Sequence, residues 1–121
     1  MSLQTQPVIL LIGKDETLSY LLARFAEHTG YEWKISADHV AGSEIAAIKP
    51  AVIIFLSTEL LAMDQSLLTE LSDLEAPIVV CSSVLEQARA RELGADYCLL
   101  HPLTLSAFQT ALATVQASKH T

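Results

Sequence analysis

The stretch KPAVIIFLS, residues 49–57, contains the most apolar strand candidate in the chain. From Ala51 to Leu56 it has no polar position and is rich in β-branched residues. Such a continuous run is typical of a strand buried on both faces, as in parallel sheets covered by helices. The stretch therefore predicts an α/β domain, in which Ser57 opens the polar loop after the strand.

The segments on either side alternate between strand and helix patterns. Short apolar runs predict further strands at Val8–Ile12, Trp33–Ala37, Ile78–Cys81 and Tyr97–Leu100. Apolar residues at helical spacing predict helices between Thr17, as N-cap, and Gly30, and at 41–48, 60–74, 84–93 and 104–117. Strands that alternate with helices in so short a chain predict one parallel sheet with helices on both faces.

Length and composition indicate a single packed domain. The chain has 121 residues, of which 51% are hydrophobic and 17% charged, so one domain is expected over residues 1–121. Residues 1–6 are expected to be disordered or to derive from an expression vector. No apolar run reaches the ~18 residues that cross a bilayer, and no signal peptide is visible, which predicts a cytoplasmic protein without membrane contact. Cys81 and Cys98 lie in apolar runs and are expected to be reduced and buried.

The charge pattern argues against a nucleic-acid partner. The formal net charge is −7, and the seven basic residues are scattered along the chain. Binding to DNA or RNA depends on a clustered basic face. The one local pair, Arg89 and Arg91, shares its predicted helix with Glu86 and Glu92 and fits an ordinary solvated face.

Polar loops follow four of the predicted strands, at the sheet edge where open α/β folds place their sites. They are Gly13-Lys14-Asp15-Glu16, Ser57-Thr58-Glu59, Ser82-Ser83 and His101-Pro102. Taken alone, they form no catalytic constellation. A phosphate-binding loop needs a second glycine upstream and Ser or Thr after the lysine, a nucleophile elbow needs glycines around the serine, and no cysteine or histidine spacing matches a zinc site.

Several segments in combination resemble one family. They are VILLIGKDE (8–16), GYEW (30–33), KPAVIIFLS (49–57), PIVVCSS (77–83) and GADYCLLHP (94–102). From about residue 8 to 117 the chain resembles the CheY-like receiver domains of bacterial two-component response regulators. The resemblance implies a flavodoxin-like, doubly wound five-stranded parallel sheet with strand order 2-1-3-4-5. It also implies a role in phosphorelay signal transduction.

The residues that carry phosphotransfer in this family are mostly replaced here. Receivers accept a phosphoryl group on an aspartate that ends their third strand, and this position falls on Leu56 or Ser57 here. The two acids that hold Mg²⁺ in the family fall on Gly13 and Lys14, or on Lys14 and Asp15. The family's hydroxyl residue at the end of the fourth strand corresponds to Ser82. The lysine after the fifth strand is replaced by His101, and the proline that follows it is kept as Pro102.

These replacements imply a degenerate receiver, or pseudo-receiver, that is not an enzyme. We expect Mg²⁺ binding to be weak or absent and no cofactor to be used, because too few carboxylates remain and the ammonium group of Lys14 repels a cation. One hypothesis is that Lys14 replaces the metal by neutralising Asp15 or Glu59. The alternative is that Lys14 points into solvent.

The implied output is a protein–protein interaction that does not depend on phosphorylation. The partner would be a histidine kinase, a regulator or an effector domain, and a homodimer is possible. In the family, the face that commonly carries such contacts corresponds here to Glu86, Arg89, Ala90, Tyr97, Leu99 and Gln109. Two alternatives stay open: a relay with Ser57 or Asp15 as substitute acceptor, and a small-ligand site at Ser82-Ser83.

Overall fold

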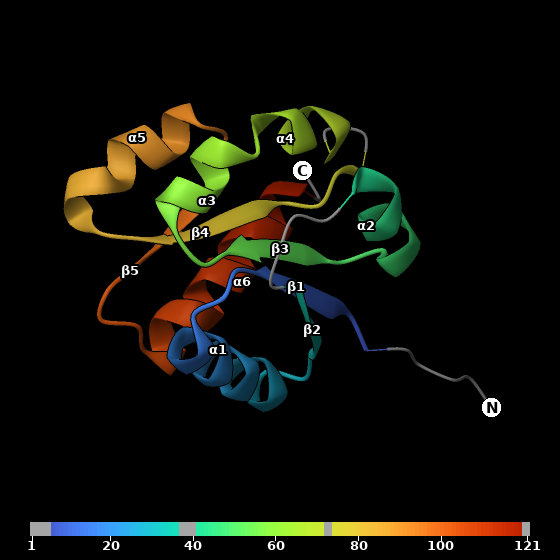
Figure 1. Cartoon of the computed structure of the whole chain (residues 1–121). Coiled ribbons are helices and arrows are strands. Elements are labelled where there is room, and N and C mark those ends of the chain that lie inside the picture. Colours follow the sequence, from blue (N-terminus) through green and yellow to red (C-terminus); the bar gives the residue numbers. More distant parts are fainter. Residues whose placement is uncertain (1–5, 37–40, 72–73, 120–121) are drawn as a thin grey trace.

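The computed structural model describes residues 6–36, 41–71 and 74–119. It contains one parallel sheet with the strand order β2-β1-β3-β4-β5 (Figure 1). The strands are β1 (Val8–Ile12), β2 (Glu32–Ser36), β3 (Val52–Phe55), β4 (Ile78–Ser82) and β5 (Tyr97–Leu100). The predicted fold class and strand order are therefore confirmed. Residues 1–5 of the predicted N-terminal tail and Ala37 of the second predicted strand lie outside the described residues.

Helices cover both faces of the sheet, with α1 and α6 on one face and α2 to α5 on the other (Figure 1). Their bounds are α1 (Glu16–His28), α2 (Gly42–Ile48), α3 (Thr58–Met63), α4 (Gln65–Leu71), α5 (Gln87–Glu92) and α6 (Leu105–Lys119). A short 3-10 turn, Val84–Glu86, precedes α5. No helix within the described part of the chain is long and apolar enough to cross a membrane.

The central strand β3 contributes to both halves of the core. Ile54 packs with Leu22 of α1 and Phe108 of α6, whereas Ile53 and Phe55 pack on the other face of the sheet. All four residues of β3 are fully buried. Burying an Ile or Phe side chain contributes about 1.5–3 kcal/mol, so the apolar run that predicted the strand also stabilises it.

Two details of the helix prediction were wrong. The N-cap of α1 is Asp15, whose Oδ1 accepts a hydrogen bond from the Leu18 amide at 2.9 Å, and Thr17 lies inside the first turn. The predicted helix 60–74 is two helices, because Asp64 leaves the helical conformation at φ −119° and ψ 43°. Next to this break, the Gln65 side-chain amide donates to carbonyls at the ends of both α3 and α5.

The carboxyl ends of β1 and β3 approach each other very closely. A Cβ atom added to Gly13 would lie 2.8 Å from the Cβ, Cγ and Cδ1 atoms of Leu56. Gly13 also has a φ of +149°, which side chains rarely adopt. Only glycine fits beside Leu56 in this arrangement, so the two residues form one packing unit, defined here as the Gly13–Leu56 contact.

We expect Gly13→Ala to lower the free energy of unfolding by about 2–4 kcal/mol, since backbone strain and overpacking add. In a Leu56→Ala background the loss from Gly13→Ala should be smaller by at least about 0.5 kcal/mol, because most of the clashing atoms are gone. Urea unfolding of the four proteins in this double-mutant cycle measures the difference.

Gly30→Ala is the matched control. Gly30 also has a positive φ, +83°, but a Cβ there meets nothing within 4 Å. Its replacement should cost only about 1–2 kcal/mol of backbone strain, and the same amount in both backgrounds. Equal losses for Gly13→Ala with and without Leu56 would contradict the packing described above.

Candidate functional site

Main-chain hydrogen bonds bring the predicted site loops to one edge of the sheet. The Gly13 amide donates to the Ser36 carbonyl at 2.9 Å, and the Leu56 amide donates to the Ile12 carbonyl at 2.9 Å. At the other side of the sheet the His101 amide donates to the Ser82 carbonyl at 3.2 Å. The loops after β1, β3, β4 and β5 are therefore ordered side by side, as the strand order requires.

Of the two residues at the predicted acceptor position, Leu56 is the one that follows β3 directly and lies against Gly13. It is 4% exposed and belongs to the core cluster formed with α1 and α6. Ser57 is half-buried, and its Oγ accepts a hydrogen bond from the Leu60 amide at 3.2 Å as the N-cap of α3. The position at the end of β3 therefore holds a hydrocarbon side chain.

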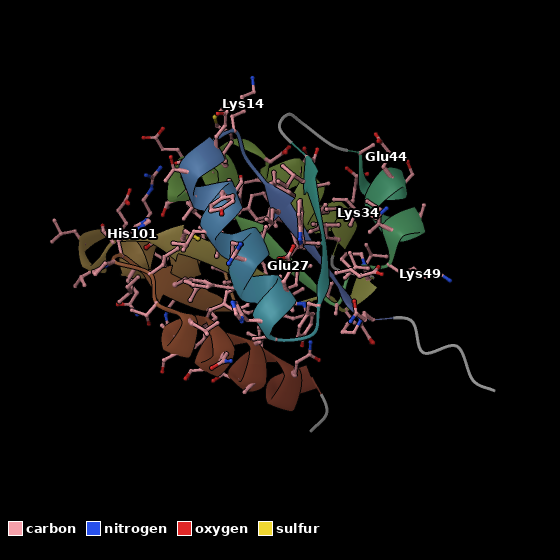
Figure 2. The ribbon with its side chains drawn as sticks, turned by 90° about the horizontal axis from the view of Figure 1, so that it is seen from below. Lys14, Glu27, Lys34, Glu44, Lys49 and His101 are labelled. Carbon is pink, nitrogen blue, oxygen red and sulfur yellow. The ribbon has the colours of Figure 1, made fainter. Side chains whose placement is uncertain are left out.

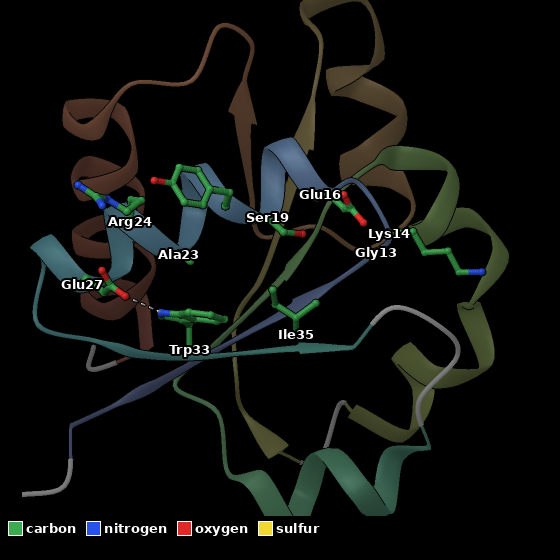
Figure 3. A pocket seen from close by; sticks show the side chains of 10 residues that line it. Gly13, Lys14, Glu16, Ser19, Ala23, Arg24, Glu27, Trp33 and Ile35 are labelled. Atoms are coloured by element: carbon green, nitrogen blue, oxygen red, sulfur yellow. Dashed lines mark hydrogen bonds between the residues drawn. The ribbon is translucent and has the colours of Figure 1, made fainter.

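The positions predicted for the acid pair supply at most one carboxylate. Gly13 has no side chain, and Lys14 is exposed and extends away from the sheet (Figures 2 and 3). The Asp15 carboxylate caps α1 through the Leu18 amide. Lys14 therefore lies at the surface of this edge, and its role in neutralising Asp15 or Glu59 stays a prediction.

The remaining predicted site residues are Ser82, His101 and Pro102. Ser82 is buried, and its hydroxyl donates to the neighbouring Ser83 carbonyl at 3.0 Å. His101 and Pro102 are both exposed, and the bond between them is cis. The Ser82 hydroxyl is thus engaged with its own loop.

A hydroxyl and two thiols are buried near this edge. The Thr58 hydroxyl, next to the acceptor position, is buried without a hydrogen-bond partner, which costs about 1–3 kcal/mol. Burial, and secondarily the charge of Asp15, raises the pKa of the Cys81 thiol to about 12. Burial also raises the pKa of Cys98, against the opposing effect of Arg91. Both cysteines are buried free thiols, as predicted.

The residues of this edge do not suit Mg²⁺, which prefers several hard oxygen ligands. Among the positions that correspond to the family's phosphotransfer residues, Asp15 is the one acid, and its carboxylate caps a helix. Its neighbour Lys14 carries a positive charge. Within residues 6–36, 41–71 and 74–119, no group of three or more His, Cys, Asp or Glu side chains is arranged to hold a metal ion.

The predicted interface is only partly at the surface. Ala90 and Leu99 are buried, so their inclusion in the interface was wrong. The cause is the sidedness of α5 and β5, which turn these two side chains into the core on opposite faces of the sheet. Ala90 joins the half of the core under α2 to α5, and Leu99 joins the half under α1 and α6. Of the other four residues, Arg89 and Gln109 are exposed, and Glu86 and Tyr97 are half-buried.

A groove that the sequence did not reveal lies between α1 and β2 (Figure 3). Its volume is 660 Å³, and its lining runs from Gly13 and Lys14 along Ala23 of α1 to Trp33 and Ile35 of β2. It was missed because the exposed residues of a short edge strand have no helical or buried-strand periodicity to mark them.

Comparisons with known proteins agree on the architecture. No protein-family model and no curated protein matches the chain. Among solved structures, chemotaxis protein CheY4 of Vibrio cholerae superposes with a TM-score of 0.70 at 16% identity, over 92% of this chain and 99% of that one. A CheY-like receiver domain protein of Methanospirillum hungatei JF-1 gives a TM-score of 0.69 at 15% identity, over 96% and 98% of the two chains.

A third structure, from Chloroflexus aurantiacus and assigned as a response regulator, gives a TM-score of 0.74 at 17% identity, over 93% of this chain and 99% of that one. These neighbours share the parallel sheet and its helical layers over nearly their whole length. At such low identity the likeness concerns the fold and not the chemistry of the pocket. The chain has the CheY-like receiver fold of response regulators.

Proposed function

We propose that this protein is a signalling module of a two-component system that has lost phosphotransfer and acts by binding other proteins. The observation that carries the proposal is the Gly13–Leu56 contact. A phosphoryl acceptor has to present an oxygen at the end of β3, and here the position is filled by leucine packed on glycine. The module would be non-enzymatic, without a cofactor, and would work in the cytoplasm.

The polar groups near this contact support the same conclusion. Ser57 caps α3 and Asp15 caps α1, so each candidate substitute acceptor already holds a helix end. A phosphorylated serine would also be a stable ester, which resets slowly. Neither Ser82 nor Ser83 lines the groove between α1 and β2 or the cavity beside α4 and α5. These two cavities therefore give no support to the small-ligand alternative.

The proposed partner is a histidine kinase, a regulator or an effector domain. The exposed and half-buried residues near α5, β5 and α6 offer a mixed-charge surface for it, formed by Glu86, Arg89, Tyr97 and Gln109. Mixed charge and partial burial suit a reversible contact. Because leucine fills the position of the family's phosphoacceptor, we infer that binding takes place without phosphorylation.

The first test is an amide NMR titration of the protein with Mg²⁺ and then with beryllofluoride, a mimic of the phosphoryl group. We expect no saturable shifts at Lys14, Asp15, Ser57, Ser82 or His101, because the carboxylates that would bind the metal are missing. Saturating shifts at these residues would show that the pocket still binds metal and phosphate, against the proposal.

A rebuilt variant gives the positive control. Lys14→Asp combined with Leu56→Asp places two new carboxylates beside Asp15 and removes one positive charge. We expect this variant to be less stable without metal, because the carboxylate that replaces the Leu56 side chain would be a buried charge. Millimolar Mg²⁺ should raise its melting temperature and produce saturable shifts, whereas the melting temperature of the wild type should not respond.

The second test measures intact mass after treatment with a small phosphodonor and Mg²⁺. We expect no gain of a phosphoryl group by the wild type, since neither Leu56 nor a free carboxylate at the end of β3 accepts it. Ser57→Ala and Asp15→Asn identify any acceptor. A mass gain that either variant abolishes would establish the substitute-acceptor relay in place of the proposed function.

A further inference from the structure

The edge strand β2 has a surface that the proposed function does not use. Its place at the end of the order β2-β1-β3-β4-β5 gives it one strand neighbour in the sheet. Four of its five residues are exposed, including Trp33 at 38% and Ile35 at 44%. Large apolar side chains on an exposed edge strand are a feature that native proteins usually avoid, because another strand can pair there.

The main-chain groups of β2 point alternately toward β1 and toward the outer edge. The Glu32 amide donates to the Pro7 carbonyl, and the Ser36 carbonyl accepts from the Gly13 amide, each at 2.9 Å. These two residues therefore bond to β1, as alternate residues of a parallel ladder do. Trp33 and Ile35 occupy the other set of alternate positions, so their N–H and C=O groups point to the outer edge.

The side chains of Trp33 and Ile35 lie on the α1 side of the sheet and form the floor of the groove (Figure 3). The indole Nε1 of Trp33 donates to Glu27 Oε2 of α1 at 3.2 Å, which fixes the ring against the helix. Across the groove, Tyr20 is 66% exposed, and the guanidinium of Arg24 lies 6.0 Å from the centre of its ring. The groove is thus apolar, ordered in advance and adjacent to the outer edge.

We propose that a second copy of this chain binds here, by antiparallel pairing of β2 with β2 of the partner about a two-fold axis at Trp33. A two-fold contact requires a surface that is complementary to itself. In this register the two Trp33 residues exchange main-chain hydrogen bonds. The sheets of the two copies then join into one, and both grooves lie on the same side of it.

Charge complementarity selects this register. When Trp33 lies opposite Trp33, Glu32 of each copy lies opposite Lys34 of the other, which gives two pairs of opposite charge. A shift that centres the axis on Lys34 (Figure 2) places the two lysines opposite each other, at the short distance of a non-hydrogen-bonded pair. An axis at Ile35 sets Lys34 opposite Ser36 and loses both charge pairs.

The same register closes the apolar groove. The partner's Trp33 and Ile35 lie on the same face as the groove, because residues opposite each other in antiparallel strands share a face. The rings of the two Trp33 residues become cross-strand neighbours, and aromatic pairs of this kind are favourable in sheets. This complementarity of strand, charge and apolar face favours a second copy over an unrelated peptide.

The test exchanges the two charges of β2, singly and together. Glu32→Lys gives a strand with two lysines, and Lys34→Glu gives one with two glutamates, so each variant places like charges opposite each other twice. We expect each variant to weaken dimerisation about tenfold or more in sedimentation velocity. The double variant Glu32→Lys/Lys34→Glu should dimerise like the wild type, and so should an equal mixture of the two single variants.

Matched controls change the same charges elsewhere. Glu92→Lys on α5 and Lys49→Glu at the end of α2 are exposed substitutions with the same charge differences, and they should leave dimerisation unchanged. Trp33 is the only tryptophan, so its fluorescence should shift to shorter wavelength as the wild type associates. Amide NMR spectra of the single variants check that they remain folded.

Three outcomes would overturn the proposal. A wild type that stays monomeric up to high micromolar concentration has no such contact. A dimer that Glu32→Lys and Lys34→Glu leave intact uses another surface. A dimer that the single variants break and the double variant does not restore has another register. The proposal is independent of the proposed loss of phosphotransfer, which none of these measurements tests.

Discussion

The close approach of Gly13 to Leu56 fills the carboxyl edge of the sheet with hydrocarbon between β1 and β3. β1 and β3 are neighbours at the centre of the sheet, and their ends meet where this fold usually has its site. With glycine on one strand and leucine on the other, the gap is filled by hydrocarbon. The core cluster that includes Ile54 thus continues to the very end of β3.

Around this contact, polar side chains contribute to the stability of the fold. The Asp15 carboxylate and the Ser57 hydroxyl accept hydrogen bonds from amides in the first turns of α1 and α3, where no main-chain partner exists. Each such cap is typically worth about 1 kcal/mol. The Ser82 hydroxyl is bound to the carbonyl of Ser83. Groups of the chemical types that a phosphate site would use are therefore engaged in local structure.

The sequence predicted the strands well, because a strand buried on both faces leaves an uninterrupted apolar run such as Val52–Phe55. It did not decide between Leu56 and Ser57, since that choice depends on register, which the hydrogen bond from Leu56 to Ile12 defines. The break at Asp64 was missed because amphipathic spacing continues across it. Ala90 was misplaced because the sequence of a short helix does not show which side packs on the sheet, and Leu99 because both faces of β5 are covered by helices.

A ligand shifts a conformational equilibrium only by the difference in its affinity for the two states. On the proposed function, the edge at Leu56 binds neither metal nor phosphate, so that route to a switch is closed. Control must then come from the concentration of the protein or of a partner, because association depends on both. A preformed surface suits such control: the indole of Trp33 is already fixed by Glu27, which lowers the entropy lost on binding. In a module without a phosphorylation switch, signalling then depends on binding at preformed edges and faces of the molecule.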